Sequence, residues 1–137
     1  MIAGFDHSLS KLASSSVTVS SGNGFQEPGQ ASVALVFADG TRLQAEYWRL
    51  IDNGRASVSS FDHQQKYGLL AVIDAVREIQ EKLQSRMVVE ALHDKETGDL
   101  LFKFTGDLKL QILNVTGYEV WEIEFPDGTG EYSNHAK

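Results

Sequence analysis

The chain has 137 residues, a formal net charge of -7 and no cysteine. Its length is typical of one domain, residues 1–137, with a core of its own. The acidic balance argues against nucleic acid and anionic membranes as partners. The missing cysteines exclude disulfides, thiolate nucleophiles and cysteine-ligated zinc, and they fit a cytoplasmic protein.

The N-terminal part combines weak helical spacing with turn residues. Phe5, Leu9 and Leu12 lie four and three residues apart, which favours a short helix. The serine-rich residues 14–20 end in a strand pattern. Residues 21–30 contain three glycines and a proline, which predicts a mobile loop.

Two strands joined by a tight turn are expected next. Residues 31–37 and 41–48 alternate apolar and polar side chains. The Asp39-Gly40 pair between them tolerates the positive φ of a hairpin turn. A short strand pattern then covers residues 56–60, and a polar loop follows.

One main helix is expected over residues 69–84. Burial of its apolar face contributes roughly 9–18 kcal/mol, and ordering its backbone costs a comparable amount. The helix therefore needs a sheet to pack against. Its apolar residues recur at helical spacing and are Leu69, Val72, Ile73, Val76, Ile79 and Leu83.

The stretch from Asp99 to Phe125 has the strongest strand pattern. Alternation of apolar and polar side chains recurs over residues 99–105, 108–112 and 121–125, with turn residues between them. We therefore predict a single α+β domain, in which an antiparallel meander carries the 69–84 helix.

The two halves of the chain are similar to each other. Residues 10–50 and 81–123 each run from a Lys-Leu pair through a strand pattern and a hairpin, and Trp48 corresponds to Trp121. A duplication would give two related α+β halves about a pseudo-twofold axis. Chance similarity between short hairpins is the alternative.

A polar cluster before the helix is the first candidate site. It contains Ser59, Ser60, Asp62, His63 and Tyr67. This composition suits a hydrolase or a small-ligand pocket, but the chain has no Gly-x-Ser-x-Gly motif. We favour the structural alternative, in which Asp62 and His63 bind backbone groups and fix the loop that enters the helix.

Aromatic residues and carboxylates form a second candidate, a surface for a basic protein partner. Tryptophan and tyrosine are enriched at protein interfaces, although we expect at least two of these aromatic residues in the core. For the glutamates, a solvated sheet face or a protected sheet edge is the alternative. The residues are Trp48, Tyr118, Glu119, Trp121, Glu122 and Glu124.

Neither a metal nor a cofactor is expected. The histidines are scattered without metal-ligand spacing, and no glycine-rich phosphate loop is present. His135 is expected to be solvated in the tail. The four histidines are His7, His63, His93 and His135.

Several short motifs within residues 31–128 are similar to those of a known group. They include residues 47–51, Asp62-His63-Gln64, residues 117–122 and Pro126-Asp127-Gly128. The chain resembles an uncharacterised family of small bacterial proteins, loosely similar to immunity proteins of polymorphic toxin systems. That family has Asp-His-Gly-Gln and Phe-Gly-Leu-Pro at the helix entry, where this chain has other residues and no proline.

The resemblance implies a non-enzymatic cytoplasmic protein that binds another protein. Our leading hypothesis is therefore an immunity-type module whose acidic surface covers a basic site. The alternatives are a ligand binder or hydrolase-like enzyme with a pocket near Asp62, His63 and Tyr67, and a homodimer formed through sheet edges.

Overall fold

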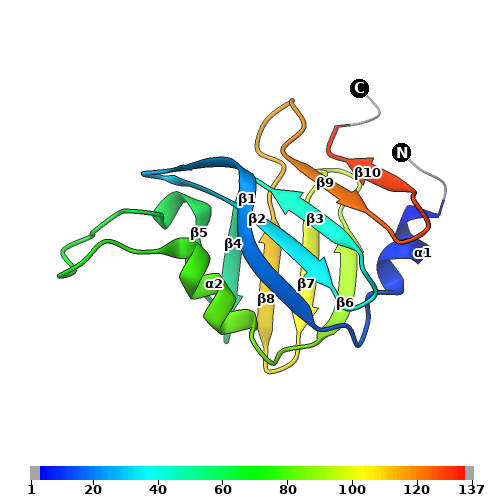
Figure 1. Cartoon of the computed structure of the whole chain (residues 1–137), viewed down its shortest axis with the longest axis horizontal. Helices are drawn as coiled ribbons and strands as arrows, with labels where there is room; N and C mark the ends of the chain where they lie inside the picture. Colours follow the sequence, from blue (N-terminus) through cyan, green and yellow to red (C-terminus); the bar gives the residue numbers. More distant parts are fainter. Residues whose placement is uncertain (1–3, 135–137) are drawn as a thin grey trace.

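The computed structural model describes residues 4–134 and contains two five-stranded antiparallel sheets around one apolar core (Figure 1). This confirms the α+β class. His135 lies outside the described residues. The elements are α1 (Phe5–Ser10), β1 (Val17–Glu27), β2 (Gln30–Phe37), β3 (Arg42–Ala45), β4 (Trp48–Asp52), β5 (Arg55–Ser59), η1 (Ser60–Asp62), α2 (Ala75–Leu83), β6 (Val88–His93), β7 (Leu100–Phe104), β8 (Leu108–Ile112), β9 (Trp121–Glu124) and β10 (Gly130–Tyr132).

The first sheet has the strand order β1-β2-β3-β9-β10, and the second has the order β5-β4-β8-β7-β6. The meander predicted over residues 99–125 is therefore confirmed for β7 and β8 and wrong for β9. This strand pairs with β3 in the other sheet, where Leu43 lies opposite Ile123. Alternation shows which face of a strand is buried, and it does not identify the neighbouring strand.

The loop predicted over residues 21–30 is also wrong, because β1 and β2 continue through it to a tight turn. Gly22 and Gly24 instead allow close approach of chain segments. A Cβ atom at Gly22 would lie 2.8 Å from Ser32 Oγ, and one at Gly24 would lie 2.9 Å from Glu46 Oε1. The β1–β2 pairing shifts register in this stretch.

The main helix packs as expected, but it begins later than the predicted residues 69–84. Asp74 caps the start of α2 by accepting a hydrogen bond from Arg77 N at 3.1 Å. Leu69 and Val72 precede this cap and are exposed. The helical spacing of Leu69 and Val72 therefore made the predicted helix too long at its N-terminal end, because it ignored the cap at Asp74. The buried face of α2 consists of Ala75, Val76, Ile79 and Leu83.

The two halves of the chain have the same strand order. Strands β1-β2-β3 lie in the first sheet and β4-β5 cross to the second, whereas β6-β7-β8 lie in the second and β9-β10 cross to the first. Each half thus gives three strands to one sheet and two to the other. Residues 10–50 and 81–123 each contain the first three of these strands and the start of the fourth, so a repeat is compatible with this order and stays a prediction.

The chain changes sheet between β3 and β4 and again between β8 and β9, and matching contacts stabilise both of these crossing points. Trp48 begins β4 and its backbone N–H donates to Ser60 Oγ at 3.2 Å. Trp121 begins β9 and its backbone N–H donates to Ser133 Oγ at 3.3 Å. Each indole N–H also donates to a backbone carbonyl near the start of β2 or β7, at 2.7 and 2.9 Å. Both serines are buried.

The core between the sheets is closely packed. Phe37 of β2 meets Phe102 of β7 with ring centroids 5.4 Å apart. Leu35, Leu43 and Leu110 are fully buried nearby. Within residues 4–134, neither α1 nor α2 has the length and apolar composition needed to cross a membrane.

The buried serines provide a test of the crossing points. Replacing Ser60 by Ala leaves the buried Trp48 N–H without this acceptor, and we expect the free energy of unfolding to fall by about 1–3 kcal/mol. Ser133→Ala should have a similar effect. Urea denaturation followed by tryptophan fluorescence measures both. Ser20→Ala, at an exposed strand position, is the control, and equal stability of all three variants would contradict the assignment.

Candidate functional site

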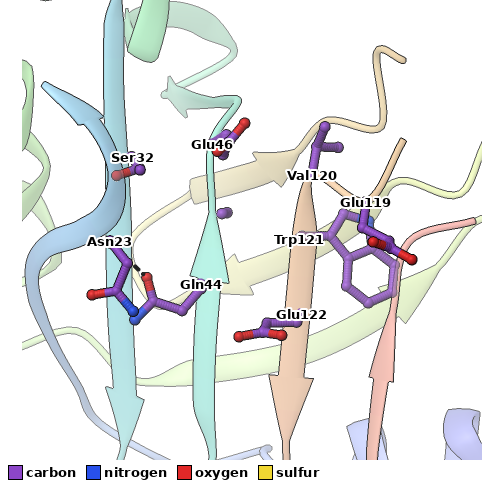
Figure 2. Close-up of a pocket in the computed structure, with 10 residues that line it drawn as sticks. Asn23, Ser32, Gln44, Glu46, Glu119, Val120, Trp121 and Glu122 are labelled. Atoms are coloured by element: carbon purple, nitrogen blue, oxygen red, sulfur yellow. Dashed lines mark hydrogen bonds between the residues drawn. The ribbon is translucent and has the colours of Figure 1, made fainter. Parts of the chain in front are cut away.

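Two adjoining hollows lie on the outer face of the first sheet. One has a volume of about 240 Å³ and the other of about 320 Å³. They share Gln44 of β3 and Glu122 of β9, so they form one groove across the middle of the sheet. Figure 2 shows the side chains that line the first hollow. We call this feature the acidic groove.

Strand alternation and pairing position the floor of the acidic groove. Gln44 and Glu122 point outward, between neighbours that are buried in the core. The β3–β9 pairing places Gln44 opposite Glu122 and Arg42 opposite Glu124. Side chains from both halves of the chain therefore meet on one surface.

The irregular part of β1 forms one wall of the groove. The backbone N–H of Asn23 donates to Gln44 Oε1 at 3.1 Å (Figure 2). Gln26 Nε2 donates to the backbone oxygen and the hydroxyl of Ser32 at 2.8 and 3.0 Å. These bonds hold the bulged strand against β2 and β3.

Paired asparagines hold the opposite wall, the loop before β9. Asn114 and Asn134 donate to each other's side-chain oxygens at 2.9 and 3.0 Å. Asn134 Nδ2 also donates to the backbone oxygens of Thr116 and Tyr118 at 2.9 and 2.7 Å. The loop that carries Glu119 is therefore fixed at both ends.

The groove has a strongly negative lining. Besides the buried Glu131, its glutamates are Glu46, Glu119, Glu122 and Glu124, and among the described lining residues Arg42 is the one basic side chain. Within residues 4–134, none of these four glutamates takes part in an ion pair. Their charges are therefore available to a partner.

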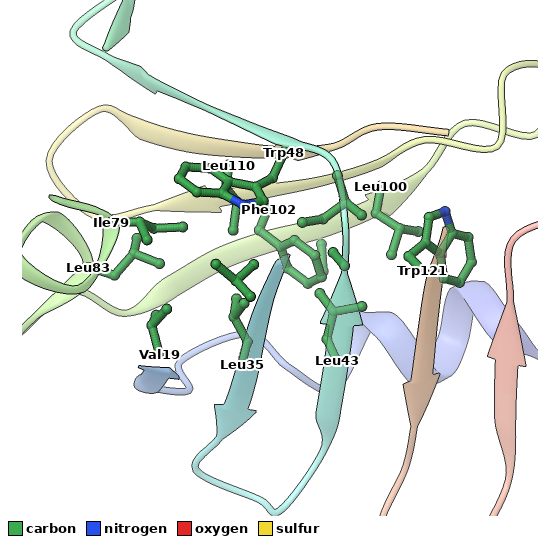
Figure 3. Packing of buried hydrophobic residues seen from close by; sticks show 14 of the residues in the cluster. Val19, Leu35, Leu43, Trp48, Ile79, Leu83, Leu100, Phe102, Leu110 and Trp121 are labelled. Atoms are coloured by element: carbon green, nitrogen blue, oxygen red, sulfur yellow. The ribbon is translucent and has the colours of Figure 1, made fainter. Parts of the chain in front are cut away.

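The structure separates the predicted surface residues into two groups. Tyr118 and Glu119 lie on the exposed loop, beside Glu122 and Glu124 on β9. The two tryptophans belong to the core, and Figure 3 shows both among the buried side chains. This confirms the expectation that at least two of the aromatic residues lie in the core. It excludes Trp48 as a contact for a partner, whereas part of Trp121 lines the groove.

Sequence reasoning missed the β3 side of the groove. Arg42, Gln44 and Glu46 alternate with buried residues in the predicted strand, so their outward direction could be read from the pattern. What could not be read was that β9 would lie beside β3. Asn23 was missed because its segment was expected to be a loop.

The polar cluster before the helix makes structural contacts. His63 is buried, and its Nδ1 accepts a hydrogen bond from the backbone N–H of Ala75 at the start of α2, at 3.1 Å. Asp62 accepts from Ser59 N at 2.8 Å and from Tyr67 OH at 3.0 Å. The hydrogen bond to Asp62 raises the pKa of Tyr67.

These contacts favour the structural alternative over a hydrolase-like site. Within residues 4–134, the His63 ring has no hydrogen bond with a serine hydroxyl, so no nucleophile and base are joined. In the same part of the chain, no three His, Asp or Glu side chains form a group that could hold a metal ion.

A second histidine lies beneath α1. The ring of His93 is 5.1 Å from that of Phe5 and 6.2 Å from that of Trp121, between centroids. Its Nδ1 is buried without a hydrogen-bond partner in the described structure. Burial lowers the pKa of His93, although the carboxylates of Asp6 and Glu131 oppose this shift.

Comparison with known proteins gives no match: no family model, no curated protein and no solved structure matches the chain.

Removal of the His63 ring tests its structural role. His63→Ala takes away the acceptor for the Ala75 N–H, and we expect the free energy of unfolding to fall by about 1–3 kcal/mol. Chemical denaturation measures this loss. The exposed His7→Ala is the matched control. A His63→Ala variant as stable as the His7→Ala variant would show that α2 does not depend on this contact.

The half-buried His93 predicts a pH dependence of stability. Because its pKa is lowered in the folded chain, the unfolded chain binds more protons below about pH 6.5. The free energy of unfolding should therefore fall as the pH drops through this range. His93→Phe keeps an aromatic ring beside Phe5 and should reduce the pH dependence. Unchanged pH dependence in denaturation series at several pH values would refute this role.

Proposed function

We propose that the chain is a non-enzymatic protein-binding module, whose acidic groove holds a lysine- or arginine-bearing segment of another protein. The observation that carries this proposal is the gathering of four glutamates without ion-pair partners, within residues 4–134, around one groove. Buried or paired carboxylates would indicate a structural role instead.

The matching face of the second sheet has the opposite charge. There, Gln111 of β8 lies opposite Arg49 of β4, as Gln44 lies opposite Glu122 in the first sheet. Arg49 Nε donates to Gln111 Oε1 at 2.7 Å. The two sheet faces have the same arrangement of strands, so the difference in their charge comes from their side chains alone. This supports a specific role for the acidic face.

The spacing of the glutamates suits an extended peptide. Glu122 and Glu124 are two residues apart on one strand, so their Cα atoms lie about 7 Å apart and their side chains share a face. An extended partner segment has the same period. Basic side chains at every second position would therefore face both carboxylates.

An immunity-type role is the biological setting that we propose for this binding. In that setting, the acidic groove covers a basic site on a toxin protein, as the resemblance to immunity proteins implies. The rival site near Asp62, His63 and Tyr67 has less support, because all three side chains already hold the structure around the start of α2.

Binding of a labelled peptide of alternating lysine and serine tests the groove. We expect the double variant Glu122→Gln and Glu124→Gln to bind this peptide about tenfold more weakly, because two charge contacts are lost. Added salt should weaken wild-type binding as well. Fluorescence anisotropy gives the dissociation constants.

The matched control is the double variant Glu78→Gln and Glu96→Gln. It changes the net charge by the same amount at two exposed positions outside the groove. We expect it to bind the peptide nearly as well as the wild type. Equal weakening of both double variants would show that only net charge matters, and it would reject the groove as the binding site.

A further inference from the structure

An apolar finger projects from the end of the molecule beside the β1–β2 turn (Figure 1). It is the segment 64–73, which replaces the first turns of the predicted helix. Backbone hydrogen bonds of 2.8 and 2.9 Å between residues 64–65 and residue 73 close its base. A 2.7 Å bond closes a β-turn at its tip, where Tyr67 and Gly68 have positive φ. The finger is thus an ordered hairpin.

Two further contacts tie the finger to the body of the protein. The Tyr67 hydroxyl donates to Asp62, and the backbone N–H of Gly29 in the β1–β2 turn donates to His63 O at 2.8 Å. The apolar tip is therefore presented at a defined place.

Aromatic side chains continue the apolar surface beside the finger. Phe61 stacks on Tyr47 with ring centroids 5.6 Å apart. Phe25 and Tyr47 line a shallow hollow together with Glu46. The finger and this hollow lie at the same end of the folded molecule. We call the exposed apolar side chains at this place the apolar end. Its members are Phe25, Phe61, Tyr67, Leu69, Leu70 and Val72.

The apolar end exposes a large apolar area for a monomeric protein. Its exposed fractions run from 46% for Phe61 to complete exposure of Leu70. With roughly 150–250 Å² for a fully exposed aromatic side chain, the three aromatic members alone expose about 270–450 Å², and the three aliphatic members add to this area. Apolar patches on monomers rarely exceed a few hundred Å², whereas each partner of a standard interface buries about 800 Å².

We propose that the apolar end is the twofold interface between two copies of this chain. This exposed apolar area is a large part of what each copy in a stable dimer buries. A twofold contact also buries the apolar ends of both copies at once, because it uses the same surface on each copy. This inference stands independently of the proposed function.

Sedimentation velocity over a dilution series tests the interface. We expect the wild-type chain to form a dimer with a dissociation constant on the order of micromolar. Leu70→Glu should weaken the dimer at least about tenfold, because the variant places a charge in the contact. Leu70 is fully exposed in the monomer, so the variant should keep its circular dichroism spectrum. Val115→Glu, at another exposed apolar position, should dimerise like the wild type.

Chemical labelling gives a second readout, because the chain has no cysteine. Leu69→Cys should react slowly with a maleimide at dimer concentrations and faster after dilution, whereas Val115→Cys should react fast throughout. A wild-type chain that stays monomeric at every concentration would overturn the proposal, as would normal dimerisation of Leu70→Glu. If the chain stays monomeric and binds neutral phosphatidylcholine vesicles, the finger is a lipid-binding segment and the dimer proposal is wrong.

Discussion

Exchange of strands between the two sheets is the constraint on which the rest of the structure depends. Strand β9 pairs with β3, with Ile123 opposite Leu43, and strand β4 pairs with β8, with Leu50 opposite Leu110. Neither half of the chain completes a sheet without the other. The buried serines at the two crossings accept hydrogen bonds from the strands that cross, so the exchange does not leave these backbone N–H groups unsatisfied in the core.

The same exchange creates the acidic groove that we connect with function. The acidic groove exists because a strand of the second half lies beside one of the first half, which brings Glu122 next to Gln44. The equivalent pairing in the other sheet carries Arg49 and Lys109. One backbone arrangement thus displays two faces of opposite charge. The acidic groove and the shallow hollow beside the apolar end share Ser32 and Glu46 and otherwise use different residues.

The sequence predicted most strands and the main helix well, but it predicted poorly which strands pair with each other. Alternation identified the strands around Phe102, Leu110 and Ile123, because a half-buried strand has an apolar period of two. It could not assign the last of these to the other sheet, since pairing depends on contacts distant in sequence. Glycines suggested a loop at residues 21–30 because composition does not reveal that Gly22 allows close approach of Ser32. Of the candidate site, Glu122 and Glu124 were found, and their β3 neighbours were not.

The central claim is that side chains from two halves of the chain form one acidic binding surface. Backbone amide chemical shifts of the protein, recorded during titration with the alternating lysine and serine peptide, test it most directly. The account predicts shifts that cluster in residues 42–46 and 119–124, with little change at Arg49 and Lys109. Shifts that cluster around Asp62, His63 and Tyr67, or that scatter over both sheet faces, would contradict it.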